Sequence, residues 1–210
     1  LTTKNKPAVL DELPPKPPSI TKPPFEDPLP ISWKVRDIGR PLKGGQKIED
    51  DSWVFYGGGD DIWNTNDQFR YAYKKLDTDF SFSIKIDSLY NVHQYAKAGL
   101  MVRKTLNPNS AHGLVNIFPS GNTEFGYRSS NGETMKADSG PQIDLEDARL
   151  KIKKSRNIIE FFVSGASTWE KIGELNIKKW GKSFYVGIAT LSHDNSQLTK
   201  AQYSEIDLDY

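Results

Sequence analysis

The sequence predicts an all-β protein, an antiparallel sandwich or jelly roll of two sheets, and three observations lead to this prediction. Apolar and polar residues alternate with a period of two, as in residues 80–86, which is typical of a strand with one buried face. Turn-forming clusters of Gly, Pro, Asn and Ser, such as 119–122 and 130–132, separate the short alternating stretches. No fixed repeat of tens of residues is evident, which disfavours a propeller or a solenoid.

Residues 1–30 differ in composition from the rest of the chain. Nine of the 13 prolines lie there, and proline favours an extended polyproline conformation over helix or sheet. We therefore expect a Pro-rich linker or arm, foremost a stiff tether, ahead of one domain over residues 31–210. Apolar residues such as Ile20 and Phe25 leave open an ordered arm that packs on the domain. A chain that begins at Leu1 without methionine indicates processing or trimming.

Within residues 31–210, short strands are expected in succession. In chain order they are 53–56, 69–73, 80–86, 96–103, 113–118, 124–129, 148–153, 158–164, 169–175, 184–190 and 201–208. Only residues 145–150 indicate a helical turn. Many short strands with turns between them favour a two-sheet sandwich.

Composition excludes several classes of partner. The chain has 28 Lys and Arg against 27 Asp and Glu, and a net charge of +1 does not attract nucleic acid or an anionic membrane surface. Cysteine is absent, so disulfides and thiolate chemistry are excluded. No apolar run approaches the roughly 20 residues that a membrane span needs. A neutral ligand fits this charge balance.

A glycine turn over residues 57–59 leads into Asp60, Asp61 and Trp63. Because glycine tolerates a positive φ, this turn can direct bulky and charged side chains toward a ligand. Trp63 lies in a polar setting, and for it ligand contact and a structural corner are both open. Asp60 and Asp61 are adjacent, so in extended backbone they point apart and do not form a catalytic dyad.

The expected strand over residues 97–103 has one partly polar face. Lys97, Gly99, Met101 and Arg103 share it, and glycine leaves room beside the long side chains. The Arg103 guanidinium suits pairs of hydroxyls or a carboxylate, and we expect it in a cleft that faces solvent, although an ion pair with a neighbouring strand is equally open.

Several segments, in order and spacing, resemble the "regulation of enolase protein 1-like" domain of the concanavalin A-like lectin/glucanase superfamily, from about residue 32 to the C-terminus. They are residues 33–39, 60–63, 67–69, 97–103 and 185–189. The resemblance implies two antiparallel sheets, one of them curved so that its concave face holds a ligand. It also implies a histidine beside the strand that ends at Arg103, which His112 matches. One turn departs from the family pattern, since residues 164–169 lack its acidic residue.

Our leading hypothesis is a non-catalytic carbohydrate-binding module, because sugars stack on aromatic rings while polar groups bind their hydroxyls. The candidate ligand-binding residues are Asp61, Trp63, Arg103, His112, Asn116, Tyr127 and Arg128, of which Trp63 and Tyr127 would stack on sugar rings. We expect a polysaccharide or oligosaccharide ligand, no nucleic acid, and a monomer that is secreted, periplasmic or at the cell surface. A membrane would be reached only through an anchor upstream of Leu1.

Two other function classes stay open. The first is a glycoside hydrolase or a polysaccharide lyase, in which Arg103, His112 and a tyrosine would act on an acidic polysaccharide. The paired carboxylates of retaining glycosidases, spaced along one strand, are missing from the sequence. The second is a protein-interaction module. We expect no cofactor and no catalytic metal; a structural calcium ion bound through Asp207 or Asp209 stays open.

Overall fold

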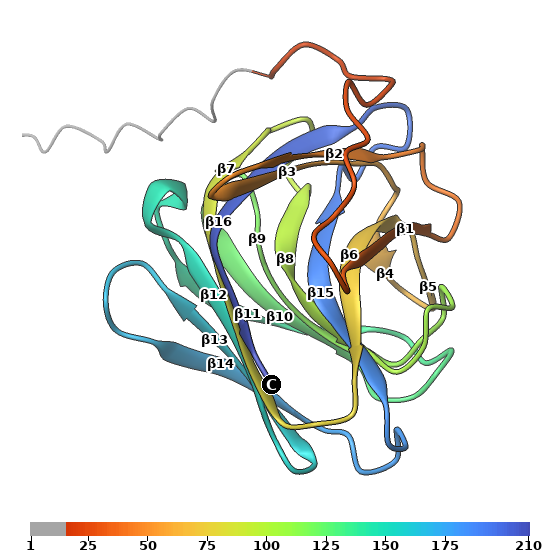
Figure 1. Ribbon diagram of the computed structural model, residues 1–210, viewed down its shortest axis with the longest axis vertical. Coiled ribbons are helices and arrows are strands. Elements are labelled where there is room, and N and C mark those ends of the chain that lie inside the picture. Colours follow the sequence, from red (N-terminus) through yellow and green to blue (C-terminus); the bar gives the residue numbers. More distant parts are fainter. Residues whose placement is uncertain (1–15) are drawn as a thin grey trace, which may run out of the picture.

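The computed structural model describes residues 16–210, and in this part of the chain two antiparallel sheets of seven strands each face one another (Figure 1). The first sheet has the order β1 (Lys34–Ile38), β6 (Phe69–Leu76), β15 (Phe184–Leu191), β8 (Lys97–Arg103), β9 (His112–Ile117), β10 (Asn122–Arg128) and β11 (Lys136–Gln142). The second has the order β14 (Glu170–Asn176), β13 (Ile158–Ser164), β12 (Arg149–Ser155), β7 (Phe80–Leu89), β16 (Thr199–Asp209), β3 (Ser52–Gly57) and β2 (Gly45–Glu49). The predicted all-β sandwich is confirmed.

The core between the sheets follows the period of two. In β7, Phe80, Phe82, Ile84 and Ile86 are buried, and the serines and lysine between them are partly exposed. In β8, the buried residues Ala98, Leu100 and Val102 point into this core. Burying such apolar surface is the main stabilising contribution to folding.

The outer face of the first sheet carries a second apolar cluster. Met101 of β8 and Leu114 of β9 pack there with Ile62, which belongs to a small hairpin of β4 (Ile62–Trp63) and β5 (Asn66–Asp67). The hairpin thus covers part of this outer face (Figure 1). Because side chains alternate along β8, residues 97, 99, 101 and 103 share the outer face, as the sequence predicted.

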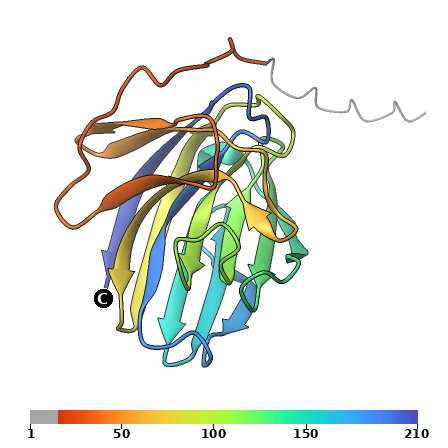
Figure 2. The same cartoon turned by 90° about the vertical axis from the view of Figure 1, so that its right-hand side faces the viewer.

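Part of the Pro-rich segment lies against the sandwich. Leu198 N donates a hydrogen bond to Ile20 O at 2.7 Å, and Gln46 N of β2 donates one to Phe25 O at 3.1 Å. Figure 2 shows residues 16–30 passing over one end of the sandwich. The prediction of a free tether is therefore wrong for residues 20–27. The alternative of an ordered arm holds there, because the backbone of Ile20 and Phe25 is hydrogen-bonded to the sandwich. Residues 1–15 lie outside the described part of the chain.

The structure also bears on the predicted helical turn, on membrane-spanning helices and on metal sites. The helical turn predicted at residues 145–150 is a 3-10 helix over Leu145–Asp147, and β12 follows it. No helix within residues 16–210 has the length and hydropathy needed to cross a membrane. In the same range, no group of three or more His, Asp or Glu side chains is placed to hold a metal ion.

Candidate functional site

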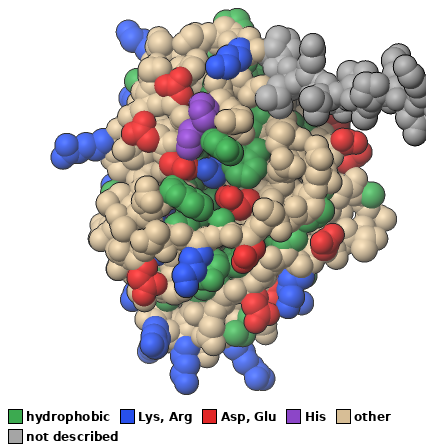
Figure 3. All heavy atoms as spheres, turned by 180° about the vertical axis from the view of Figure 1, so that it is seen from behind, with side chains coloured by type: hydrophobic (Ala, Val, Ile, Leu, Met, Phe, Trp, Pro, Cys, Tyr) green, Lys and Arg blue, Asp and Glu red, His purple; other side chains and the backbone are tan. Residues whose placement is uncertain are grey.

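A cleft of about 770 Å³ opens on the outer face of the first sheet. Its lining residues come from the ends of several strands and from the loops between them: Asp61, Trp63, Gln94, Tyr95, Lys97, Phe118, Ser120, Asn122, Thr123, Glu124, Ser139, Gly140 and His193. The face shown in Figure 3 brings histidine, hydrophobic, acidic and basic side chains together. We call this hollow the outer cleft.

Two aromatic side chains of the outer cleft project into solvent. Trp63, at the end of β4, is 39% exposed, and Tyr95, in the loop between β7 and β8, is 50% exposed. The Tyr95 ring meets the Phe118 ring edge-on at 6.0 Å and the His193 ring at 5.4 Å. Exposed rings held in fixed positions suit stacking against the flat face of a sugar or another ring.

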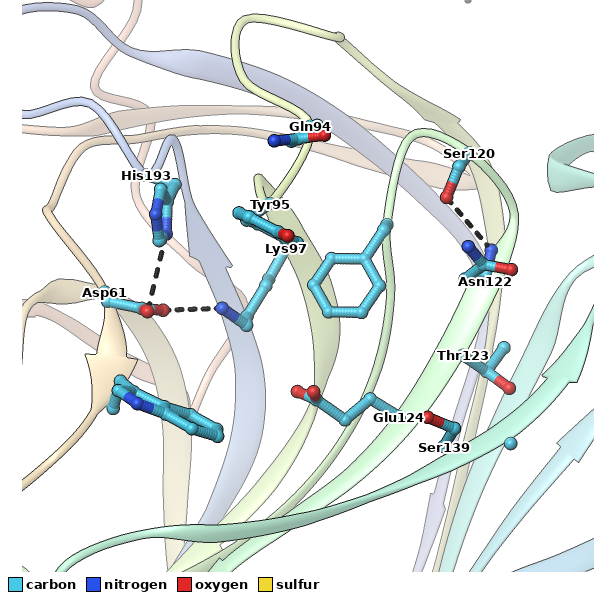
Figure 4. Close-up of a pocket in the computed structure, with 13 residues that line it drawn as sticks. Asp61, Gln94, Tyr95, Lys97, Ser120, Asn122, Thr123, Glu124, Ser139 and His193 are labelled. Atoms are coloured by element: carbon cyan, nitrogen blue, oxygen red, sulfur yellow. Dashed lines mark hydrogen bonds and ion pairs between the residues drawn. The ribbon is translucent and has the colours of Figure 1, made fainter.

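Asp61 contacts both Lys97 and His193 in the same cleft. Asp61 Oδ1 accepts a hydrogen bond from Lys97 Nζ at 2.5 Å, and Asp61 Oδ2 lies 3.5 Å from His193 Nδ1 (Figure 4). Burial alone would raise the pKa of Asp61, but the contact with His193 and the charge of Lys97 outweigh it and lower that pKa below its usual value. The His193 ring also stacks on His93, with 4.4 Å between ring centroids.

Glu124 of β10 is the second acid of the cleft. It lies opposite Asn116 in the pairing of β10 with β9, and its side chain extends from β10 into the cleft (Figure 4). Burial raises the pKa of Glu124, and the nearby charge of Asp61 adds to this rise while that of Lys97 opposes it. Two carboxyl groups with pKa values shifted in opposite directions therefore share one cleft.

Beside the cleft, Asp67 of β5 is buried between two arginines. Its Oδ2 accepts a hydrogen bond from Arg103 Nη1 at 2.8 Å, and its Oδ1 accepts one from Arg128 Nη2 at 2.9 Å. All three side chains have an exposed fraction of 0%. Burial alone would raise the pKa of Asp67, but neighbouring His112 and the two guanidinium groups lower it below its usual value.

His112 completes what we call the Asp67 network, formed by Asp67, Arg103, His112 and Arg128. Its Nδ1 lies 3.2 Å from the Ser110 carbonyl oxygen and 3.6 Å from Asp67 Oδ2. The contact with the carbonyl oxygen favours a ring that carries a proton on Nδ1. Burial lowers the pKa of His112 to about 4; the negative charge of Asp67 opposes this shift and the two guanidinium groups add to it.

The network holds the hairpin that presents the cleft residues. Arg128 Nη2 donates to the backbone carbonyls of Asn64 at 2.9 Å and Trp63 at 3.3 Å. Asp67 lies on the other strand of this hairpin, so both of its strands are tied to β8 and β10. The indole of Trp63 is left free of this anchoring and reaches the cleft.

The structure separates the seven candidate residues into groups. Asp61 and Trp63 line the outer cleft. The expectation that Arg103 faces solvent was wrong, because its guanidinium pairs with buried Asp67, and His112 and Arg128 are buried with it. This is the ion pair with a neighbouring element that the sequence left open.

The remaining two candidates also differ from the expectation. Tyr127 is adjacent to Arg128 in β10, so the two side chains point to opposite faces of the sheet. Tyr127 stacks on Phe125 with 5.3 Å between centroids and packs on the core between the sheets, away from the cleft. Asn116 is fully buried on the cleft side, next to Glu124 in the strand pairing.

Gly59 sets the direction in which the chain enters the site. Its φ is +125°, and a Cβ at this position would overlap the backbone oxygen of Gln68. We expect Gly59→Ala to cost about 2 kcal/mol of unfolding free energy, because it combines an unfavourable φ with overpacking against backbone. Chemical denaturation of both proteins measures this difference.

Gly181 supplies the matched control for this prediction. Its φ is +92°, yet a Cβ there would have no neighbour within 4 Å. Gly181→Ala therefore tests the backbone strain alone, and we expect it to cost less than Gly59→Ala. Equal costs for both variants would show that the contact with Gln68 relaxes.

Comparisons with known proteins identify the fold. No protein-family model and no curated protein matches the chain. A functionally unknown protein from Saccharomyces cerevisiae superposes with a TM-score of 0.65 at 14% identity, over 85% of this chain and 96% of that one. The carbohydrate-binding module CBM66 from Bacillus subtilis gives 0.53 at 10% identity, over 90% and 99% of the two chains. A legume lectin-like domain from Entamoeba histolytica gives 0.56 at 12%, over 88% and 95%. The chain has the concanavalin A-like sandwich fold.

Proposed function

We propose that this concanavalin A-like sandwich is a carbohydrate-binding module that binds a polysaccharide or oligosaccharide in the outer cleft. The observation that carries the proposal is the cleft itself, in which exposed Trp63 and Tyr95 stand beside hydrogen-bonding groups of Asp61, Lys97 and Glu124. Aromatic rings that stack on sugar C–H faces, with polar groups around them for the hydroxyls, are the chemistry that carbohydrate recognition needs.

The comparisons support this proposal at the level of the fold. Among the similar structures, one is described as a carbohydrate-binding module and another as a legume lectin-like domain. We also propose that the chain belongs with the "regulation of enolase protein 1-like" domains that it resembles in sequence. As part of the same proposal, the protein is exported, acts as a monomer and does not bind nucleic acid, in line with its net charge of +1.

Substitution of the exposed rings tests the proposal. We expect Trp63→Ala and Tyr95→Ala each to weaken glycan binding by about 10–100-fold, the equivalent of roughly 1–3 kcal/mol of stacking, with little loss of stability because both rings are exposed. Affinity electrophoresis or calorimetry against a panel of plant, algal and host polysaccharides measures this.

Tyr210→Ala is the matched control, since Tyr210 is 57% exposed and does not line the cleft. It should bind as the unmodified protein does. If no glycan of the panel binds, or if Tyr210→Ala weakens binding as much as Tyr95→Ala, the outer cleft is not the carbohydrate site. Self-association in light scattering would instead favour the protein-interaction module.

One observation favours a second candidate, a glycoside hydrolase. The lowered pKa of Asp61 and the raised pKa of Glu124 resemble the division between an ionised carboxylate and a general acid. Release of new reducing ends from the same panel would reveal such an activity. A lyase that uses Arg103 and His112 has less support, because both side chains are buried outside the cleft.

A further inference from the structure

One row of residues crosses the first sheet and contributes Glu124 and Ser139 to the lining of the outer cleft. Strand pairing places Ala189 of β15, Gly99 of β8, Asn116 of β9, Glu124 of β10 and Ser139 of β11 side by side. Asn116 and Glu124 are the two large side chains of this row, and small residues flank them. Asn116 lies beside Glu124, fully buried and outside the lining of the cleft.

Those two groups have unmet hydrogen-bonding capacity. Glu124 Oε1 is buried, and so are Asn116 Oδ1 and Nδ2, yet none of these atoms has a hydrogen-bond partner among residues 16–210. The Asn116 side chain is 0% exposed. Buried polar groups are normally paired, and leaving them unpaired costs free energy, so the unpaired carboxyl oxygen of Glu124, which lines the cleft, points to a ligand that pairs with it.

Lys97 does not neutralise Glu124 directly. Its ammonium donates to Asp61 Oδ1 at 2.5 Å, and no ion pair with Glu124 occurs in the described part of the chain. Asp61 and Glu124 together outnumber the single lysine of the cleft. A ligand with a carboxylate would therefore meet repulsion, whereas hydroxyl groups can donate to Glu124 without a charge.

We propose that Glu124, with Asn116 buried beside it, forms a subsite that binds adjacent hydroxyl groups of a neutral sugar and excludes uronic acids. This inference rests on the proposed function and specifies its ligand class. The hydroxyls donate to the carboxylate of Glu124, which has acceptor capacity for more than one of them, while Asn116 lies buried beside it.

Glu124→Gln tests this subsite, with Glu205→Gln as the matched control. Glu205 is exposed on the second sheet, paired with Arg149 and outside the outer cleft. We expect Glu124→Gln to bind neutral glycans about 10–100-fold more weakly, since bonds to a charged acceptor are the stronger ones. The same variant should unfold at a higher temperature at pH 7, because it replaces a buried carboxylate that the fold disfavours.

Glycan pairs that differ only in oxidation at C6, β-1,4-glucan with β-1,4-glucuronan and β-1,4-mannan with β-1,4-mannuronan, test the ligand class in calorimetry. We expect binding to a neutral polymer and none to its uronate counterpart, while Glu205→Gln binds as the unmodified protein does. Tighter binding of a uronate polymer or of a chitosan oligosaccharide would overturn the inference.

The outcomes also separate this inference from the proposed function. If Trp63→Ala and Tyr95→Ala lose binding but Glu124→Gln keeps it, the subsite is wrong and the carbohydrate-binding function stands. If the unmodified protein binds no glycan at all, both are wrong.

Discussion

Asp67→Asn should lower the unfolding free energy by about 3–5 kcal/mol, a large part of the stability of a domain of this size. The substitution keeps the shape of the side chain but removes the charge that two fully buried guanidinium groups share. Arg103 and Arg128 then stay buried without an ionic partner, which is far more costly than the loss of an exposed pair. Urea denaturation at pH 7 measures the difference.

Glu205→Gln makes the same chemical change at an exposed ion pair. Glu205 accepts two hydrogen bonds from Arg149, but its side chain is 54% exposed, so we expect a cost below about 1 kcal/mol. A similar cost for Asp67→Asn would contradict our description of the Asp67 network. From the sequence, Arg103 was expected in a cleft that faces solvent, with an ion pair to a neighbouring strand as the open alternative.

The strands with strong alternation could be predicted from the sequence. Residues 80–86 and 158–164 each place an apolar side chain on the core at every second position, and the structure has β7 and β13 there. By contrast, β11 runs over Lys136–Gln142, includes Gly140 and Pro141, and buries none of its side chains fully. It is a strand because it pairs with β10 at the edge of the sheet, and local sequence does not carry that information.

The candidate site was predictable only in part. Asp61 and Trp63, which follow the glycine turn, line a surface cleft, and their contact with a ligand stays a prediction. The partly polar face of residues 97–103 was also identified, but whether it faces solvent depends on the β4–β5 hairpin that covers Arg103. A sequence contains no direct sign that Asp67 folds back onto a strand 36 residues later.

The position of another cleft residue, Glu124, could have been predicted from its spacing in the sequence. Glu124 and Arg128 are separated by an even number of positions in one strand, so once Arg128 was proposed for a site, Glu124 belonged to the same face. Tyr95 and His193 come from two loops, and only the fold brings their rings within 5.4 Å. Loop residues of this kind are found from the structure.

The pH dependence of stability should reveal the buried histidine. Its pKa is lowered from 6.5 to about 4 in the folded protein, so the unfolded chain takes up a proton between these values while folded His112 does not. The contribution of neutral His112 to the unfolding free energy is therefore fully present above pH 6.5 and is lost as the pH falls toward 4. The loss amounts to about 3 kcal/mol between pH 7 and pH 4.

Denaturation of the unmodified protein and of His112→Gln across this range isolates the effect, because the carboxyl groups titrate in both proteins. We expect the difference in unfolding free energy between them to shrink as the pH falls, since only the unmodified protein loses the histidine contribution. His93→Gln is the control: burial lowers the pKa of His93 in the same direction, but its side chain is only partly buried, so the His93→Gln protein should keep most of the pH dependence. Parallel curves for the unmodified protein and His112→Gln would mean that His112 takes up its proton inside the folded protein, and that Asp67 then shares three cations.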